Sequence, residues 1–160
     1  LPPSSLLPHP SSSSPLRRRL SLSTNMIDKL GAFSGMNKLR ILSLGRNAIK
    51  KLEKLDDLAP TLEELWVSYN QISSLDGVLP LTNLQVLYCS NNQIKDWGEI
   101  EKLSALPNLR EVLFKGNPIY EGLDDATARL YVIKHLPNVQ KVDSELVTDS
   151  QRAEAADLTL

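Results

Sequence analysis

The 160-residue sequence contains few residues that could carry catalytic or metal chemistry. It has one cysteine, Cys89, and two histidines, His9 and His135, that lie far apart. A single cysteine excludes an internal disulfide and a cysteine-based zinc site, and it fits a reducing compartment. Nucleophile-elbow, zinc-binding HExxH and glycine-rich phosphate-loop motifs are also missing. We therefore expect a protein with no enzymatic activity, no cofactor and no metal.

The chain also lacks an excess of one charge and has no long apolar run. The chain has 18 Lys and Arg against 19 Asp and Glu, which gives a formal net charge of -1. This balance provides no bulk electrostatic support for nucleic-acid or membrane binding. No apolar run reaches the roughly 20 residues needed to cross a bilayer. Neither nucleic acid nor a membrane is expected as a partner.

The first residues differ in composition from the rest of the chain. Eleven of the first 15 residues are Pro or Ser, no acidic residue precedes Asp28, and Arg17–Arg19 form a basic run. Such a stretch buries too little apolar surface to offset its ordering entropy. It predicts a disordered leader over residues 1–19, with the arginine run interpreted as a solvated junction.

An internal repeat organises the remaining sequence. Residues 39–49, 62–72, 84–94 and 109–119 align as L-x-x-L-x-L-x-x-N-x-I, and a weaker copy runs over residues 20–27. Successive asparagines are 22 to 25 residues apart, and they are Asn25, Asn47, Asn70, Asn92 and Asn117. This pattern and period are typical of the leucine-rich repeat. The amide of each asparagine can satisfy backbone groups where the chain turns, so we interpret this ladder as structural.

The repeat predicts an α/β leucine-rich repeat solenoid. Alternating apolar residues predict short parallel strands in a concave sheet, and apolar residues three apart predict short helical segments on the outer side. We place this domain at residues 20–143, with a C-terminal capping helix over 126–136. Residues 144–160 are predicted to be an acidic tail or a short helix.

The solvent-facing strand positions give the candidate functional site. Ile41, Trp66, Val86, Tyr88 and Leu113 would form a continuous apolar and aromatic patch on the concave face. Such exposed patches mark partner surfaces, and Trp and Tyr are enriched at binding hot spots. The full set of candidate partner-binding residues is Ile41, Ser43, Arg46, Glu64, Trp66, Tyr69, Val86, Tyr88, Asn91, Leu113 and Lys115.

Several short sequence segments resemble those of a known family. They are Leu20–Asn25, Leu39–Asn47, Thr61–Asn70, Leu87–Asn92, Lys95–Trp97 and Gly116–Pro118. Together they closely resemble the leucine-rich repeat light chains of axonemal outer-arm dynein, over residues 20 to about 143. The outward residues Arg46, Trp66, Tyr69 and Tyr88 make the match specific, because the repeat fold does not require them.

The resemblance implies a non-catalytic subunit that regulates the motility of cilia and flagella. It implies a dynein heavy chain as the partner of the concave face, and tubulin or the microtubule as a second partner near Arg152. The implied location is the cytoplasm and the axoneme, with a monomer before assembly. Two alternatives with a similar repeat length remain: a regulatory subunit of protein phosphatase 1 and a spliceosomal scaffold like the leucine-rich A-prime protein.

Overall fold

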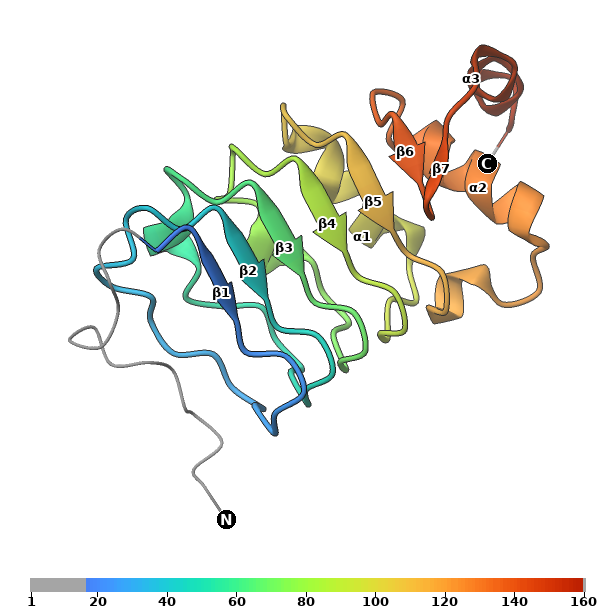
Figure 1. Ribbon diagram of the computed structural model, residues 1–160. Helices are drawn as coiled ribbons and strands as arrows, with labels where there is room; N and C mark the ends of the chain where they lie inside the picture. The colour runs from blue at the N-terminus through green and yellow to red at the C-terminus, as the bar shows by residue number, and fades with distance from the viewer. Residues whose placement is uncertain (1–16, 160) are drawn as a thin grey trace.

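The computed structural model describes residues 17–159, which form a solenoid of stacked coils (Figure 1). Most of the predicted leader, residues 1–16, lies outside the described residues. Arg19, which the sequence analysis placed in the leader, is instead the first residue of strand β1 and pairs with Ile41 of the next strand. The strands are β1 (Arg19–Ser21), β2 (Ile41–Ser43), β3 (Glu64–Trp66), β4 (Val86–Tyr88), β5 (Glu111–Leu113), β6 (Lys141–Val142) and β7 (Glu145–Leu146).

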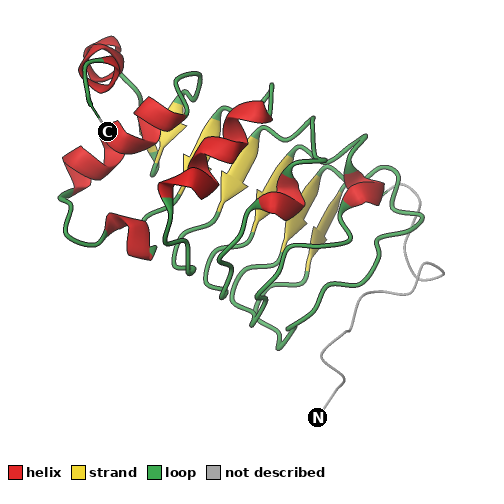
Figure 2. Ribbon diagram, turned by 180° about the vertical axis from the view of Figure 1, so that it is seen from behind, coloured by secondary structure: helices red, strands yellow, loops and turns green. Residues whose placement is uncertain are grey.

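The strands form one sheet in sequence order from β1 to β7. Neighbours are parallel from β1 to β6, and only the last pair, β6 and β7, is antiparallel. Helical segments lie on the opposite side of the coils, as the view from behind shows, and α3 lies beyond the last strand (Figure 2). They are η2 (Asp56–Leu58), η3 (Asp76–Val78), α1 (Trp97–Lys102), η4 (Leu103–Ala105), η5 (Pro118–Tyr120), α2 (Asp125–His135) and α3 (Asp149–Ala156). The predicted leucine-rich repeat solenoid with a concave parallel sheet is therefore confirmed.

Alternation within each repeat explains why the core lies between the sheet and the helices. The middle residue of each three-residue strand points inward, and the outer segments contribute leucines at three-residue spacing. Adjacent coils thereby build one continuous core from β1 to α3. No helix among residues 17–159 is both long and apolar enough to span a bilayer.

The repeated asparagines join neighbouring coils through hydrogen bonds. Asn70 Nδ2 donates to the carbonyl oxygens of Val67 in its own coil and Leu44 in the coil before, both at 3.0 Å. Its Oδ1 accepts from the N–H of Ile49 at 3.0 Å. Asn92 repeats this arrangement one coil further along. Each ladder side chain therefore satisfies backbone groups that lack a sheet partner at the turn.

A sharp turn precedes each of these asparagines. The preceding residue has a positive φ in every repeat, and these residues are Thr24, Arg46, Tyr69, Asn91 and Gly116. Residues other than glycine rarely adopt this left-handed backbone conformation. The turn therefore projects Arg46, Tyr69 and Asn91 from the edge of the sheet where the strands end.

The C-terminal end is closed by α2, the β6–β7 hairpin and α3. Arg129 of α2 is only 8% exposed, and its guanidinium donates to the carbonyl oxygens of Val142, Glu145 and Leu146. Thr148 caps the N-terminus of α3, with its side chain accepting from Gln151 N. Residues 144–159 thus contain a short strand and a helix that are fixed to the cap.

Candidate functional site

The outward strand residues form two columns across the concave sheet. In the sheet register, each residue lies beside the equivalent residue of the neighbouring strand. One column runs Arg19, Ile41, Glu64, Val86, Glu111 and Lys141, and the other runs Ser21, Ser43, Trp66, Tyr88 and Leu113. No helix of the described residues covers this side (Figures 1 and 2). Ile41, Trp66, Tyr88 and Leu113 are each partly exposed here.

Two of the predicted contact residues are not exposed on this face. Val86 is only 2% exposed, because Glu64 and Glu111 flank it in the same column with longer side chains. Ser43 is 6% exposed; it lies beside the large ring of Trp66, and its hydroxyl is 2.6 Å from that of Ser23. The expectation that these two side chains are exposed on the face is therefore wrong, and their part in partner binding stays a prediction.

Trp66 and Tyr88 form the centre of the face. Their rings stack with centroids 5.8 Å apart and an interplanar angle of 30°. The guanidinium of Arg19 lies 4.9 Å from the Trp66 ring centroid, within the range of a cation–π contact. Trp66 Nε1 is buried and has no hydrogen-bond partner in the described part of the chain. The pair is therefore a large, ordered aromatic surface that retains an unused donor.

The hydroxyl of Tyr88 links this aromatic pair to a charged group. It donates to Glu111 Oε1 at 2.9 Å, and Lys141 Nζ lies 3.6 Å from the same oxygen. Desolvation and the Glu111 carboxylate together raise the pKa of Tyr88 to about 12. The phenol therefore remains a proton donor at neutral pH, and the bond to Glu111 fixes the ring position.

Three of the predicted residues lie on the turns at the end of the strands. Arg46, Tyr69 and Asn91 are exposed, and each occupies the positive-φ position of its repeat. The Arg46 guanidinium lies 4.3 Å from the Tyr69 ring centroid. This row borders the concave face along one edge and adds polar groups next to its aromatic centre.

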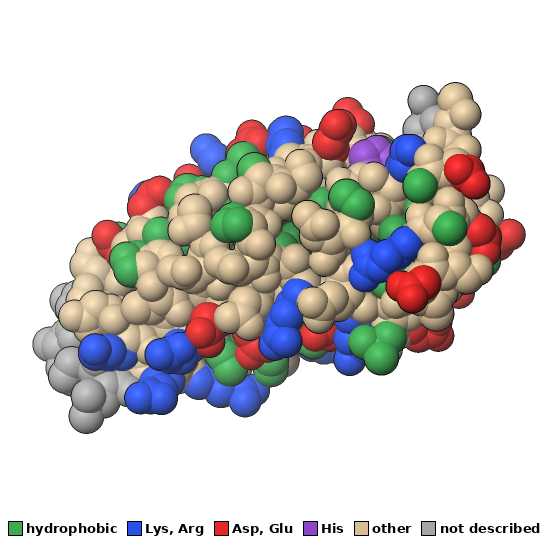
Figure 3. Space-filling model, turned by 90° about the horizontal axis from the view of Figure 1, so that it is seen from above, with side chains coloured by type: hydrophobic (Ala, Val, Ile, Leu, Met, Phe, Trp, Pro, Cys, Tyr) green, Lys and Arg blue, Asp and Glu red, His purple; other side chains and the backbone are tan. Residues whose placement is uncertain are grey.

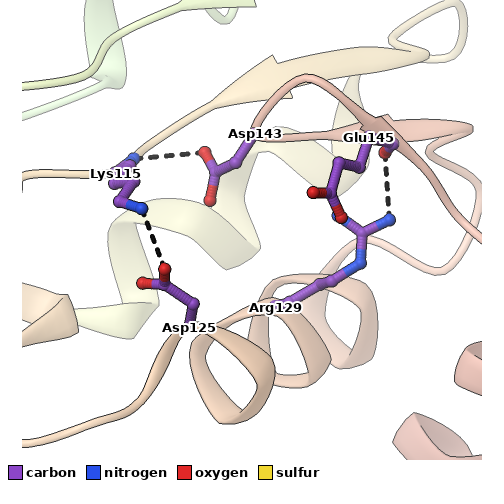
Figure 4. A pocket seen from close by; sticks show the side chains of 5 residues that line it. All are labelled: Lys115, Asp125, Arg129, Asp143 and Glu145. Atoms are coloured by element: carbon purple, nitrogen blue, oxygen red, sulfur yellow. Dashed lines mark hydrogen bonds and ion pairs between the residues drawn. The ribbon is translucent and has the colours of Figure 1, made fainter.

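Lys115 lies apart from the aromatic centre, in a charged pocket between β5 and the C-terminal cap (Figure 4). Its Nζ pairs with Asp125 Oδ2 at 2.8 Å, and its backbone N–H donates to Asp143 Oδ1 at 3.1 Å. The hydrogen bond that Lys115 donates to the Asp125 carboxylate raises the pKa of Lys115 above its usual value. Arg129 and Glu145 complete the pocket through the backbone bond described above. We interpret this pocket as a junction that holds the cap to the last coil.

Arg152, the candidate for a tubulin contact, lies on α3. Its guanidinium donates to the carbonyl oxygens of Pro137 and Val139, the latter at 2.7 Å. These bonds fix α3 to the loop before β6. The side chain is therefore already engaged within the protein.

The single cysteine of the chain lies in the core. Burial raises the pKa of the Cys89 thiol to about 12, so the sulfur stays protonated and inside the core. Among residues 17–159, no group of His, Cys, Asp and Glu side chains is placed to hold a metal ion.

Sequence reasoning left three residues of the face out of the candidate site. Arg19 was assigned to the leader, and Glu111 and Lys141 were not included. All three belong to the column that contains Ile41 and Glu64. The repeat alignment already carried this signal for Arg19 and Glu111, since they occupy the same repeat position as Ile41.

Comparison with known families and proteins places this geometry in context. The family model described as Leucine Rich repeats (2 copies) matches residues 60–102 and 82–128. Dynein axonemal light chain 1 of Chlamydomonas reinhardtii is 50% identical over 142 residues, covering 86% of this chain and 72% of the relative. The protein of the same name from Danio rerio is 42% identical over 140 residues, covering 83% of this chain and 73% of the relative.

A solved structure supports the fold independently. The Drosophila melanogaster SNF/U2A' complex contains a chain that matches with a TM-score of 0.72 at 18% sequence identity. The match covers 87% of this chain and 79% of that one. At this identity the likeness concerns the arrangement of the coils alone.

Proposed function

Since this chain belongs to the family of dynein axonemal light chain 1, we propose that it is a non-catalytic light chain of axonemal outer-arm dynein. It binds the motor region of a dynein heavy chain through its concave face and regulates the motility of cilia and flagella. It works in the cytoplasm and on the axoneme, and it is a monomer before it joins the dynein complex.

The observation that carries this proposal is the stacked Trp66–Tyr88 pair on an uncovered sheet face. Ile41 and Leu113 extend the pair on either side, so partly exposed apolar side chains continue from β2 to β5. Large aromatic residues surrounded by polar groups are the usual anchors of protein interfaces. Here Glu64, Arg46 and Tyr69 supply the polar border.

The details of the pair suit a preorganised anchor. The stacking contact and the Tyr88–Glu111 hydrogen bond hold both rings in place before a partner arrives. Binding then costs less side-chain entropy at Trp66 and Tyr88 than it would if their rings were mobile.

A tubulin contact through Arg152 has weaker support than the heavy-chain contact. The guanidinium of Arg152 already donates to two backbone carbonyls, so binding tubulin would require it to break bonds that fix α3. We retain tubulin as a second partner of the assembled dynein and assign no residue of this chain to it.

The proposal is tested by affinity purification of the tagged protein from flagellated cells, followed by mass spectrometry. We expect the parent protein to recover an outer-arm dynein heavy chain, and the double variant Trp66→Ala/Tyr88→Ala to lose it. The matched control is Met26→Ala, which removes an exposed apolar side chain outside the sheet. This control should recover the heavy chain as the parent does.

Circular dichroism and urea unfolding should show that the double variant remains folded. Equal recovery of the heavy chain by parent and double variant would contradict the assignment of the face. Recovery of protein phosphatase 1 or of spliceosomal subunits in place of dynein would contradict the proposed function and favour one of the alternatives.

A further inference from the structure

The net charge of -1 conceals a division of charge along the solenoid. Residues 17–54 contain ten Lys and Arg but only two acidic residues, Asp28 and Glu53, which gives a net charge of +8. Residues 55–160 contain eight Lys and Arg and 17 Asp and Glu, which gives a net charge of -9. The first two coils therefore form a strongly basic end on an otherwise acidic molecule.

Most basic side chains of this end form no ion pair within the described residues. Within the described residues, only Arg40 and Lys51 of the ten lie within 4.0 Å of a carboxylate, Arg40 at 2.7 Å and Lys51 at 3.8 Å. The remaining eight are Arg17, Arg18, Arg19, Lys29, Lys38, Arg46, Lys50 and Lys54. In a view from above, Lys and Arg side chains gather at the N-terminal end of the molecule (Figure 3).

The basic residues of the acidic part behave differently. Lys102, Lys115 and Lys141 pair with carboxylates. Arg129, Lys134 and Arg152 donate to backbone carbonyls. Six of the eight cations in that part thus bond within the fold, whereas most of those in the first two coils form no ion pair and leave their charge available to a ligand.

We propose that the first two coils bind an acidic segment of the protein that occupies the concave face. The guanidinium of Arg19 joins the two surfaces, because it lies on the outward column of β1 and contacts the Trp66 ring. A partner crossing the sheet would therefore place apolar residues over β3 to β5 and acidic residues over β1 and the adjoining Arg17 and Arg18. The identity of that partner as the heavy chain rests on the proposed function, whereas the basic site itself does not.

The dimensions favour a short acidic peptide over a nucleic acid. Neighbouring strands are about 4.8 Å apart, so the two basic coils together span only about 10 Å of the solenoid axis. Double-stranded DNA carries a charge about every 1.7 Å along its whole length and needs an extended basic track. Here such a polymer would meet the net charge of -9 of the remaining coils. A brief run of Asp or Glu flanked by apolar residues avoids that repulsion.

A direct test uses a fluorescein-labelled octaglutamate peptide and measures its anisotropy with the full chain at low and physiological salt. We expect binding to the parent that weakens as salt rises, since salt screens exposed charges. The variant Arg17→Glu/Arg18→Glu should bind at least about tenfold more weakly. The control Lys95→Glu/Arg110→Glu makes the same change in net charge within the acidic part. It alters two exposed residues that have no ion-pair partner in the described chain, and it should bind the peptide nearly as the parent does.

The outcomes separate this inference from the proposed function. No binding of octaglutamate by the parent, or equal losses in the two variants, would overturn the basic site. Tighter binding of a single-stranded dT20 oligonucleotide than of octaglutamate at the same salt would overturn it in favour of nucleic acid. Peptide binding that depends on Arg17 and Arg18 supports the site even if no heavy chain is recovered from cells, a result that would contradict only the proposed function. Undiminished recovery of the heavy chain by Arg17→Glu/Arg18→Glu would show that its acidic segment does not use this end.

Discussion

Asn70 and Trp66 belong to the same repeat, and they use their polar atoms in opposite ways. The side chain of Asn70 is buried, and both its Oδ1 and its Nδ2 are bonded to backbone groups of two coils. Trp66 stands on the outward side of the sheet and leaves Nε1 without a partner in the described chain. Asn70 therefore bonds neighbouring coils together, whereas the indole nitrogen of Trp66 forms no hydrogen bond within the described chain.

The difference shows how this solenoid separates stability from binding. Inward and ladder positions are constrained by the next coil, so each repeat must keep the same residue types there. Outward side chains contact one another across the face, as Arg19 does with Trp66 and Tyr88 with Glu111, so they can differ from repeat to repeat without loss of the coil. We therefore expect substitutions at the ladder to act on folding and substitutions at the face to act on the partner.

Asn92→Ala should have the largest effect on folding. It leaves the buried Ile72 N–H without a partner, which costs about 1–3 kcal/mol. It also removes the bonds from Asn92 Nδ2 to the carbonyl oxygens of Val67, Cys89 and Ser90, at about 0.5–1.5 kcal/mol each, although the Val67 oxygen keeps its bond from Asn70. We expect the free energy of unfolding to fall by about 4 kcal/mol, measured by urea denaturation. Asn25→Ala is the matched control, because Asn25 is exposed and bonds within its own coil. Equal losses at the two positions would refute the role of coil-to-coil bonding.

Gly77→Ala tests how closely the coils approach on the helical side. A Cβ at Gly77 would lie 1.9 Å from the Leu52 carbonyl oxygen, which belongs to the backbone of the preceding coil and cannot move aside alone. We expect a loss of about 3 kcal/mol in urea denaturation. Gly98→Ala should change stability much less, because its Cβ would meet only the Asp96 side chain, at 3.2 Å. A neutral Gly77→Ala would mean that the coils can separate at little cost.

Trp66→Ala should show the reverse pattern, with a larger effect on binding than on folding. Removing this anchor should weaken binding to a heavy-chain motor fragment by about 2 kcal/mol, measured by isothermal titration calorimetry. Met26→Ala, at an exposed position outside the sheet, should leave the affinity unchanged. If Trp66→Ala destabilised the fold as much as Asn92→Ala does, the separation of roles would fail.

Tyr88→Phe should have the smallest effect, and it should be visible only in alkali. The pKa of Tyr88 is raised from 10.0 to about 12 in the folded protein, so the fold favours the protonated phenol. This contribution is complete below pH 10 and is lost as the pH rises toward 12. The urea midpoint of the Phe variant should therefore decline less between these pH values. Tyr69→Phe makes the same chemical change at an exposed ring and serves as the control.

The sequence was a good guide wherever the repeat itself carries the constraint. The positions of the ladder asparagines, the inward leucines and the strand register all follow from one period. The capping helix was also expected, at 126–136, and α2 covers Asp125–His135.

The repeat period could not predict features that depend on the size of neighbouring side chains or on the fold of the cap. Val86 is covered because longer residues flank it, and Ser43 because Trp66 lies beside it. The bonds of Arg129 and Arg152 depend on how the cap folds back, which no repeat position specifies. The charge division was present in the sequence, but the sum over the whole chain concealed it.

The charge division also affects how the molecule moves before any contact forms. Opposite net charges at the two ends give the solenoid a permanent electric dipole along its long axis. In the field of a charged partner the protein is turned as it diffuses, so collisions occur with the basic coils facing a negative surface more often than chance provides. This orientation raises the rate of productive encounter at low ionic strength and fades as salt is added. The same polarity should let a single preparation bind both cation and anion exchangers.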